Sequence, residues 1–233
     1  MPVSLEHDGS VAVIGLDDGK ANALTHEVLA AIDDGLTRAS DDGAAAVLLA
    51  GRTGRFSAGF DLSVMTAGEE QMRGLVTAGA ELLMRLFTFP APVVVACTGH
   101  ALAAGALLLL AGDVRIGAAG DYKLGLNEVA IGMGLPAFAI EMARYRLTPG
   151  GFNAALLGEV YPPDVAAAVG YLDRVVAADD VVDEASRTAR RLAELRTGAV
   201  SHSKQLARAA IAQRIRDGLS DDLASVSGPN PRS

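Results

Sequence analysis

Two stretches of small residues in this chain could bring backbone N–H groups close to a bound ligand. The first is the segment at residues 51–62, GRTGRFSAGFDL, in which residues 57–59 lack bulky side chains. Small residues let a ligand approach the backbone closely, so the N–H group of Phe60 is a candidate hydrogen-bond donor. The alternative is a tight structural turn in which Asp61 caps the following helix, because glycine-rich loops are common.

The second stretch, VVVACTGHALAAGALLLLAGD at residues 93–113, predicts a buried strand, a turn and a buried helix. Its first five residues carry no charge and no side chain larger than valine, which is typical of a strand buried on both faces. We expect a turn at residues 98–100 and, at residues 101–111, a helix without a polar face. The first N–H groups of a helix lack intrahelical partners, and its dipole favours negative charge there. Donors from residues 103–105 and from Phe60 would then converge on one oxygen and form an oxyanion hole.

Glu128 is of a residue type that could move a proton. It lies in the segment LGLNEVAIG, where its neighbours Leu126, Val129 and Ile131 are apolar. Apolar surroundings raise the pKa of a carboxyl group toward neutrality, which makes the group a better general base. The alternative is a solvated or helix-capping glutamate, because charged residues are mostly exposed.

The elements that must position these residues alternate between strands and helices. Two short apolar runs within residues 3–16 predict a hairpin. Thr25 is a good N-cap for a helix whose apolar residues recur at helical spacing as far as Leu36. Further along the chain we expect a strand at 44–50, a loop at 51–59, a helix at 69–89, a strand at 113–117, helices at 137–147, 150–157 and 163–169, a strand at 175–176, and two helices within 181–217.

The composition restricts the class of protein. The 233 residues are 50% hydrophobic and carry a formal net charge of −8. We therefore expect one large globular domain, with or without an appendage, that binds neither nucleic acid nor an anionic membrane. The single cysteine, Cys97, excludes an internal disulfide framework and favours a cytoplasmic protein. We expect no signal peptide, no transmembrane span and no metal site, since the four histidines lack metal-ligand spacing.

Three segments in this order, FSAGFDL, TGHALAAGALLLLAGD and LGLNEVAIG, resemble the crotonase superfamily of enoyl-CoA hydratases and isomerases. The resemblance extends over residues 3–204 and includes the segments KANAL and VVDEA. It implies an α/β fold, a crotonase-like spiral of ββα units over residues 1–179. Residues 180–233 would form a helical C-terminal region that builds trimers, often paired into hexamers, and ends in a disordered tail.

The resemblance also implies where an acyl-CoA thioester, the substrate of the family, binds. The family's two oxyanion donors fall on the N–H groups of Phe60 and Ala104, and its adenine-binding backbone falls near Ala21 and Ala58. CoA is part of this substrate, so no separate cofactor is implied. The implied substrate-binding positions are Ala21, Ala58, Gly59, Asp61, Leu62 and Leu107.

The family's hydratases use two catalytic glutamates, and the sequence has one of them. One falls on Glu128, but the other position, three residues after Ala104, is Leu107. Residues three apart share a helix face, so the side chain at 107 would point toward a thioester bound at Ala104. Leucine offers no acceptor for a water molecule. Hydration needs a positioned water as well as a proton donor, whereas moving a double bond needs one base. The segment GLNE, with leucine at 107, is similar to the mitochondrial Δ3,Δ2-enoyl-CoA isomerases.

Three functions remain open at the level of the sequence. The first is an isomerase of fatty acid metabolism that shifts the double bond of 3-enoyl-CoA to 2-enoyl-CoA with Glu128 as its base. The second is an enoyl-CoA hydratase, a lyase that adds water to 2-enoyl-CoA. The third is an acyl-CoA binding protein that keeps the fold and the oxyanion loop without turnover.

Overall fold

A six-stranded sheet forms the centre of the fold. The computed structural model describes residues 2–225, and the strand order of its main sheet is β1-β2-β4-β7-β9-β11. Strands β1 (Val3–Asp8) and β2 (Val11–Leu16) form the predicted antiparallel hairpin, and the other neighbouring pairs are parallel. The parallel strands are β4 (Ala46–Gly51), β7 (Val93–Cys97), β9 (Val114–Ala118) and β11 (Arg174–Val176).

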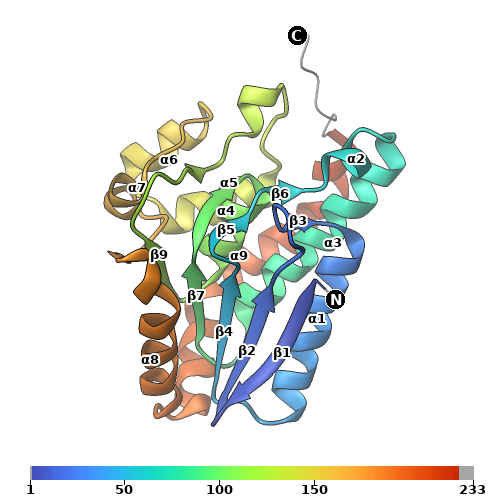
Figure 1. Ribbon diagram of the computed structural model, residues 1–233. Coiled ribbons are helices and arrows are strands. Elements are labelled where there is room, and N and C mark those ends of the chain that lie inside the picture. The colour runs from blue at the N-terminus through green and yellow to red at the C-terminus, as the bar shows by residue number, and fades with distance from the viewer. Residues whose placement is uncertain (1, 226–233) are drawn as a thin grey trace.

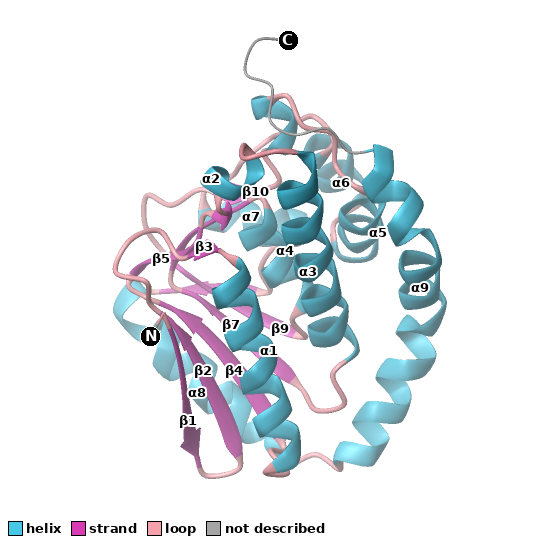
Figure 2. Cartoon of the chain, turned by 90° about the vertical axis from the view of Figure 1, so that its right-hand side faces the viewer, coloured by secondary structure: helices cyan, strands magenta, loops and turns pink. Residues whose placement is uncertain are grey.

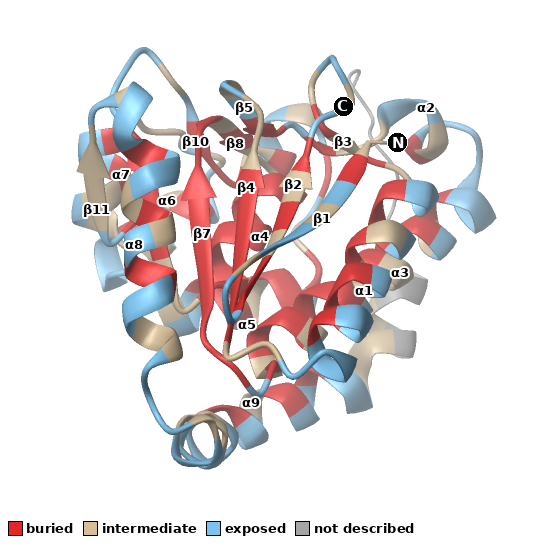
Figure 3. Ribbon diagram, turned by 60° about the horizontal axis from the view of Figure 1, so that its bottom comes forward, coloured by how far each residue is buried: buried red, intermediate tan, exposed pale blue. Residues whose placement is uncertain are grey.

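Helices cover both faces of this sheet (Figure 1, Figure 2). Helices α1 (His26–Asp41) and α3 (Glu69–Thr88) lie on one face, and α8 (Val181–Ala193) lies on the other. Successive side chains of a strand point to opposite faces, so Val47 packs in the core under α1 and α3 while Leu48 packs under α8. Figure 3 shows β4 and β7 buried along their length, which explains their continuous apolar sequences.

The structure corrects the predicted loop at residues 51–59. This segment contains strand β5 (Gly54–Ser57) and the start of strand β6 (Gly59–Phe60). Strand β6 pairs in parallel with β3 (Ala23–Leu24), which lies about 35 residues earlier in the chain. These short strands are too brief to produce a recognisable alternation of polar and apolar residues.

The structure also corrects the predicted turn at residues 98–100 and the predicted start of the buried helix. Residues Gly99–Leu102 form strand β8, and helix α4 (Ala104–Ala111) begins three residues later than expected. Strand β8 lies between β5 and β10 (Leu124–Gly125) in a second, three-stranded sheet. Since neither partner strand is adjacent in the sequence, local periodicity does not reveal this pairing.

The two C-terminal helices pack against the chain's own core. Helix α8 covers the sheet with Ala185 and Ala189, so its apolar stripe is used within the chain. Helix α9 (Thr197–Ser225) packs against α3 and α5 (Ala137–Arg146). The expected disordered tail lies outside the described residues. The remaining helices are α2 (Leu62–Met65), α6 (Pro149–Ala155) and α7 (Pro163–Val169), with 3₁₀ turns at Glu128–Ile131 and Ala178–Asp180.

A buried ion cluster ties α9 to the core. The carboxylate of Asp113, just after α4, accepts a hydrogen bond from Lys204 at 2.6 Å and forms an ion pair with Arg208 at 2.7 Å. It also accepts from the N–H group of Val93 at 2.8 Å, at the start of β7. The side chains of the two cations are 10% and 7% exposed. No helix within residues 2–225 is both long enough and apolar enough to cross a membrane.

Candidate active site

The first turn of α4 lies against strand β6. Gly59 has a φ of 92°, and a Cβ atom added to it would lie 2.9 Å from the carbonyl oxygen of Leu102 and 3.2 Å from the nitrogen of Ala104. These distances leave no room for a side chain, so the backbone at Gly59 runs directly against the first N–H group of α4. Because Phe60 follows at once, the structure brings the two predicted oxyanion donors onto neighbouring backbone segments.

Helix α4 begins without a capping side chain, and its N-cap is strained. Ala103 has φ 50° and ψ −126°, a conformation that residues with side chains rarely adopt. Its N–H group donates to the carbonyl of Gly125 at 3.0 Å, and its own carbonyl accepts from the N–H groups of Ala106 and Leu107. These bonds hold the strained residue from both sides. The N–H group of Ala104 has no intrahelical partner, as expected for the first residue of a helix.

Asn22, a residue not predicted from the sequence, supports the loop that leads into β6. Its side chain is buried, and its amide nitrogen donates to the carbonyls of Leu16 at 2.9 Å and Phe56 at 3.1 Å. The backbone carbonyl of Asn22 accepts from the Ser57 hydroxyl at 2.8 Å, and this hydroxyl accepts from the N–H group of Gly59 at 3.2 Å. Asn22 has a φ of 51°. The one feature of the sequence that could have indicated this role is that asparagine tolerates a positive φ better than most residues.

Four of the predicted CoA-binding residues lie at or near the surface, namely Ala21, Ala58, Asp61 and Leu62. The N–H group of Ala58 donates to the carbonyl of Ala21 at 3.0 Å, so these two lie together near the surface. Asp61 caps α2 by accepting from the N–H group of Ser63 at 2.7 Å, and hydrogen bonds from Ser63 hold the pKa of Asp61 below its usual value. The alternative interpretation of the sequence, in which Asp61 caps the following helix, is therefore confirmed for this side chain. Leu62 is 61% exposed, and a substrate contact remains a prediction for it.

Glu128 and Leu107 line one enclosed cavity. Its volume is about 20 Å³, which is room for about one water molecule. An acyl chain would therefore enter only by displacing side chains, and methionine is well suited to such movement. The other lining residues are all apolar and come from separate parts of the chain: Phe60, Met65, Val76, Met133, Pro136 and Phe138.

The carboxyl group of Glu128 is buried in an apolar environment. The residue is 8% exposed, and its Oε2 atom has no hydrogen-bond partner among the described residues. Burial raises its pKa to about 7, against a smaller opposing effect of its own backbone N–H group. The sequence attributes this environment to Leu126, Val129 and Ile131, but Val129 is 42% exposed. Leu126 is fully buried, and side chains that the fold brings from other elements complete the apolar surroundings.

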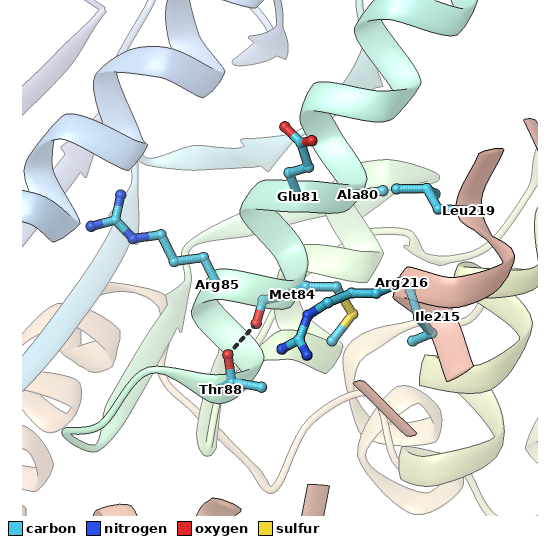
Figure 4. Close-up of a pocket in the computed structure, with 8 residues that line it drawn as sticks. All are labelled: Ala80, Glu81, Met84, Arg85, Thr88, Ile215, Arg216 and Leu219. Atoms are coloured by element: carbon cyan, nitrogen blue, oxygen red, sulfur yellow. Dashed lines mark hydrogen bonds between the residues drawn. The ribbon is translucent and has the colours of Figure 1, made fainter. Parts of the chain in front are cut away.

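Larger hollows on the surface are separate from this cavity. Figure 4 shows a groove of about 400 Å³ between α3 and α9, lined in part by Glu81, Arg85 and Arg216. A second groove, of about 520 Å³, lies between α1 and α3. Neither groove shares a lining residue with the cavity of Glu128. Within residues 2–225, no group of three or more His, Cys, Asp or Glu side chains is placed to hold a metal ion.

The mixed α/β fold with its helical C-terminal region matches solved structures of the enoyl-CoA hydratase/isomerase family. Residues 6–225 match the family described as enoyl-CoA hydratase/isomerase. The chain belongs to this family and is an enzyme of the crotonase superfamily, as the sequence resemblance implied.

Two known relatives are named as probable enoyl-CoA hydratases. A probable enoyl-CoA hydratase from Bacillus subtilis is 36% identical over 140 residues, which are 59% of this chain and 54% of that protein. A probable enoyl-CoA hydratase from Mycobacterium avium is 36% identical over 200 residues, covering 79% of this chain and 72% of that protein.

The descriptions of similar solved structures name both activities. One Mycobacterium tuberculosis protein is described as an enoyl-CoA isomerase in one structure and as a probable enoyl-CoA hydratase in another. The former has a TM-score of 0.92 and 38% identity, and covers 96% of this chain and 98% of that chain. The human mitochondrial Δ3-Δ2-enoyl-CoA isomerase has a TM-score of 0.91 and 29% identity, and covers 96% and 90%. Similarity to known proteins therefore does not distinguish isomerisation from hydration.

Proposed function

We propose that this enzyme shifts the double bond of a 3-enoyl-CoA to the 2-position, with Glu128 as its only acid–base group. The observation that carries the proposal is the pairing of Glu128 with Leu107 in one cavity whose other lining residues cannot ionise. A single buried carboxyl group with a pKa of about 7 suits a reaction that takes up one proton and returns it.

The proposed reaction moves one proton and conserves all atoms of the substrate. The carboxylate of Glu128 removes a proton from C2, and the electrons of that C–H bond move into the thioester to form a dienolate. The N–H groups of Phe60 and Ala104 would donate to the enolate oxygen, and the loss of one such donor typically costs about 2.7–4 kcal/mol. Glu128 then returns the proton to C4 as the C2–C3 double bond forms and the C3–C4 double bond is lost.

The surroundings of Leu107 disfavour hydration. Water would have to bind near C3 of a 2-enoyl-CoA and be activated by an acceptor. Leu107 is 1% exposed and has no polar atom, so it cannot hold a nucleophilic water. The substrate class is an acyl-CoA thioester, in which CoA serves as part of the substrate, and we propose that it lies along Ala21, Ala58, Gly59 and Leu62.

A paired assay tests the reaction. Purified enzyme is incubated separately with 3-enoyl-CoA and 2-enoyl-CoA of several chain lengths, and isomerisation and hydration are followed by their products. We expect isomerisation to be the faster reaction. Faster hydration of 2-enoyl-CoA would establish the hydratase instead. If calorimetry shows that both substrates bind and neither is turned over, the chain is an acyl-CoA binding protein without catalytic activity.

We further propose that the enzyme self-associates into trimers or hexamers, as its family resemblance implies. Two large apolar side chains on its surface support this proposal, because Leu157 is 79% exposed and Leu206 is 72% exposed. A cytoplasmic location is a separate proposal. It is supported by the single Cys97, which is buried and unpaired.

A further inference from the structure

Met133 forms one wall of the cavity of Glu128, and it does so from exposed backbone. Its side chain lines the cavity and the residue is only 7% exposed. The residues on either side of it, Gly132 and Gly134, are both exposed. This segment connects the 3₁₀ turn at Glu128–Ile131 to helix α5. The structure therefore holds a buried apolar side chain on surface backbone, five residues after the proposed base.

The two glycines leave the backbone around Met133 free to change direction. Gly132 ends the 3₁₀ turn in the left-handed conformation, with a φ of 75°. A Cβ atom added to Gly134 would meet no atom of the described residues within 4 Å. The N–H group of Met133 donates to the carbonyl of Glu128 at 3.0 Å, which keeps the two residues together. Because methionine has three rotatable bonds, its side chain can leave the cavity while this hydrogen bond is kept.

The other apolar walls of the cavity are fixed more firmly. The ring of Phe60 lies directly on α3, since a Cβ atom added to Gly79 would clash with it. Val76 is β-branched and stiff at χ1. Phe138 is 2% exposed and lies in α5, which packs against α4 and α9. The second methionine of the lining, Met65, lies within helix α2, where its N–H group makes a helical hydrogen bond of 3.0 Å.

The size of the cavity limits the acyl group that fits beside Glu128. Its volume of about 20 Å³ is room for about one water molecule, which is similar in size to a methyl group. In the proposed reaction Glu128 reaches C2 and C4, so a four-carbon acyl group ends in this cavity. The carbons C5 and C6 of a longer chain need further room, and the side chain of Met133 must move to provide it.

We infer that Met133 determines the acyl chain length and that four-carbon 3-enoyl-CoA is the preferred class of substrate. The inference rests on the proposed function, which places the acyl group beside Glu128. Each methylene group that is buried strengthens binding about four-fold. In the wild-type enzyme this gain is offset, because the first extra carbons displace a buried methionine side chain into water. Met133→Ala removes three non-hydrogen atoms, so two further carbons are accommodated without that loss.

Calorimetry with butanoyl-CoA and hexanoyl-CoA, which have no double bond to shift, tests the role of Met133. We expect the wild-type enzyme to bind the two with nearly equal affinity, and Met133→Ala to bind hexanoyl-CoA about fifteen-fold more tightly than butanoyl-CoA. Met133→Val should give an intermediate ratio and serves if the alanine variant does not fold. Met84→Ala is the matched control, because Met84 is 6% exposed and lines the groove between α3 and α9 instead (Figure 4). The same ratio in wild type and in folded Met133 variants would overturn the inference.

Rates with 3-butenoyl-CoA and 3-hexenoyl-CoA separate this inference from the proposed reaction. If Met133→Ala raises kcat/KM for the six-carbon substrate relative to the four-carbon one, both proposals are supported. If both substrates are isomerised but their relative kcat/KM is the same in wild type and variant, the role of Met133 is refuted and the isomerase stands. If the binding ratio changes as expected and neither substrate is isomerised, the proposed function fails while Met133 still determines which acyl chain binds.

Discussion

Glu128 illustrates how a buried carboxyl group that ionises reduces the stability of the protein that holds it. The ordinary pKa of its carboxyl group is 4.5, and burial in the fold raises this pKa to about 7. A raised pKa means that the folded state favours the protonated form. The favourable contribution is complete below about pH 4.5 and is lost as pH rises through about 7. The contribution of Glu128 to the folding stability is therefore smallest at the pH where its carboxyl group is ionised, which is the form that the proposed mechanism uses.

Replacing Glu128 by glutamine should separate activity from folding. Glu128→Gln is nearly isosteric, so the variant should fold and bind acyl-CoA while isomerisation falls by about 10²–10⁴-fold, toward the upper end for a sole base. Wild-type activity should rise with pH through about 7. At pH 8 the variant should also unfold at a higher urea concentration than wild type, because it has no carboxylate to bury. Full isomerase activity in this variant would rule out the single-base mechanism.

Leu107 is the second residue whose replacement tests the reaction. Leu107→Glu should raise hydration of 2-enoyl-CoA from a low wild-type level, because a carboxylate on this side of α4 can hold water near the Ala104 N–H group. The gain is limited, since two buried carboxyl groups raise each other's pKa. Leu107→Gln is the control, because glutamine has nearly the same size as glutamate but carries no carboxylate. Equal hydration rates in both variants would contradict this account.

At the scale of elements, the junction of β6 and α4 supplies backbone donors rather than side chains. Phe60→Ala keeps its N–H group and should retain kcat within about ten-fold, although KM should change because the ring lines the cavity. Ala104→Pro removes a donor at the first helical position, which tolerates proline, and should abolish turnover. Thermal melting checks that both variants fold. If Phe60→Ala and Ala104→Pro both fold and are equally inactive, the Phe60 side chain is itself required.

The attachment of α9 is a property of the whole molecule, because Asp113 lies far in the sequence from Lys204 and Arg208. Asp113→Asn leaves two largely buried cations without their anion and should lower the free energy of unfolding by about 3–5 kcal/mol in urea titration. Arg190→Gln breaks an exposed pair with Asp8 and should leave the free energy of unfolding nearly unchanged, because solvent and salt screen exposed pairs. Similar losses in the two variants would mean that the Asp113 cluster contributes little.

Self-association is the remaining expectation at this scale. Light scattering at micromolar concentration should give three or six times the 23.9 kDa mass of one chain. The apolar surface of α8 is already covered by the sheet, so contacts between copies would use other exposed side chains, such as Leu157 and Leu206. A mass of one chain alone would refute the proposal.

The sequence by itself determined the elements whose signals are local. The hairpin, the helix capped by Thr25 and the buried strands at residues 46–51 and 93–97 follow from alternation, capping and continuous apolar runs. The order of three motifs also predicted the family, and it named Glu128 and Leu107, which the fold brings into one cavity. These features depend on residues that are close in the chain or on a recognisable pattern.

Tertiary structure alone decided what depends on residues far apart in the chain. Strand β8 and the late start of α4 depend on pairing with β5 and β10, and the strain at Ala103 depends on the bonds that hold it there. The cavity beside Glu128 is lined by side chains from five other elements, which its neighbours in sequence do not reveal. Desolvation and strain arise from what surrounds an atom in space, and local sequence does not contain that information.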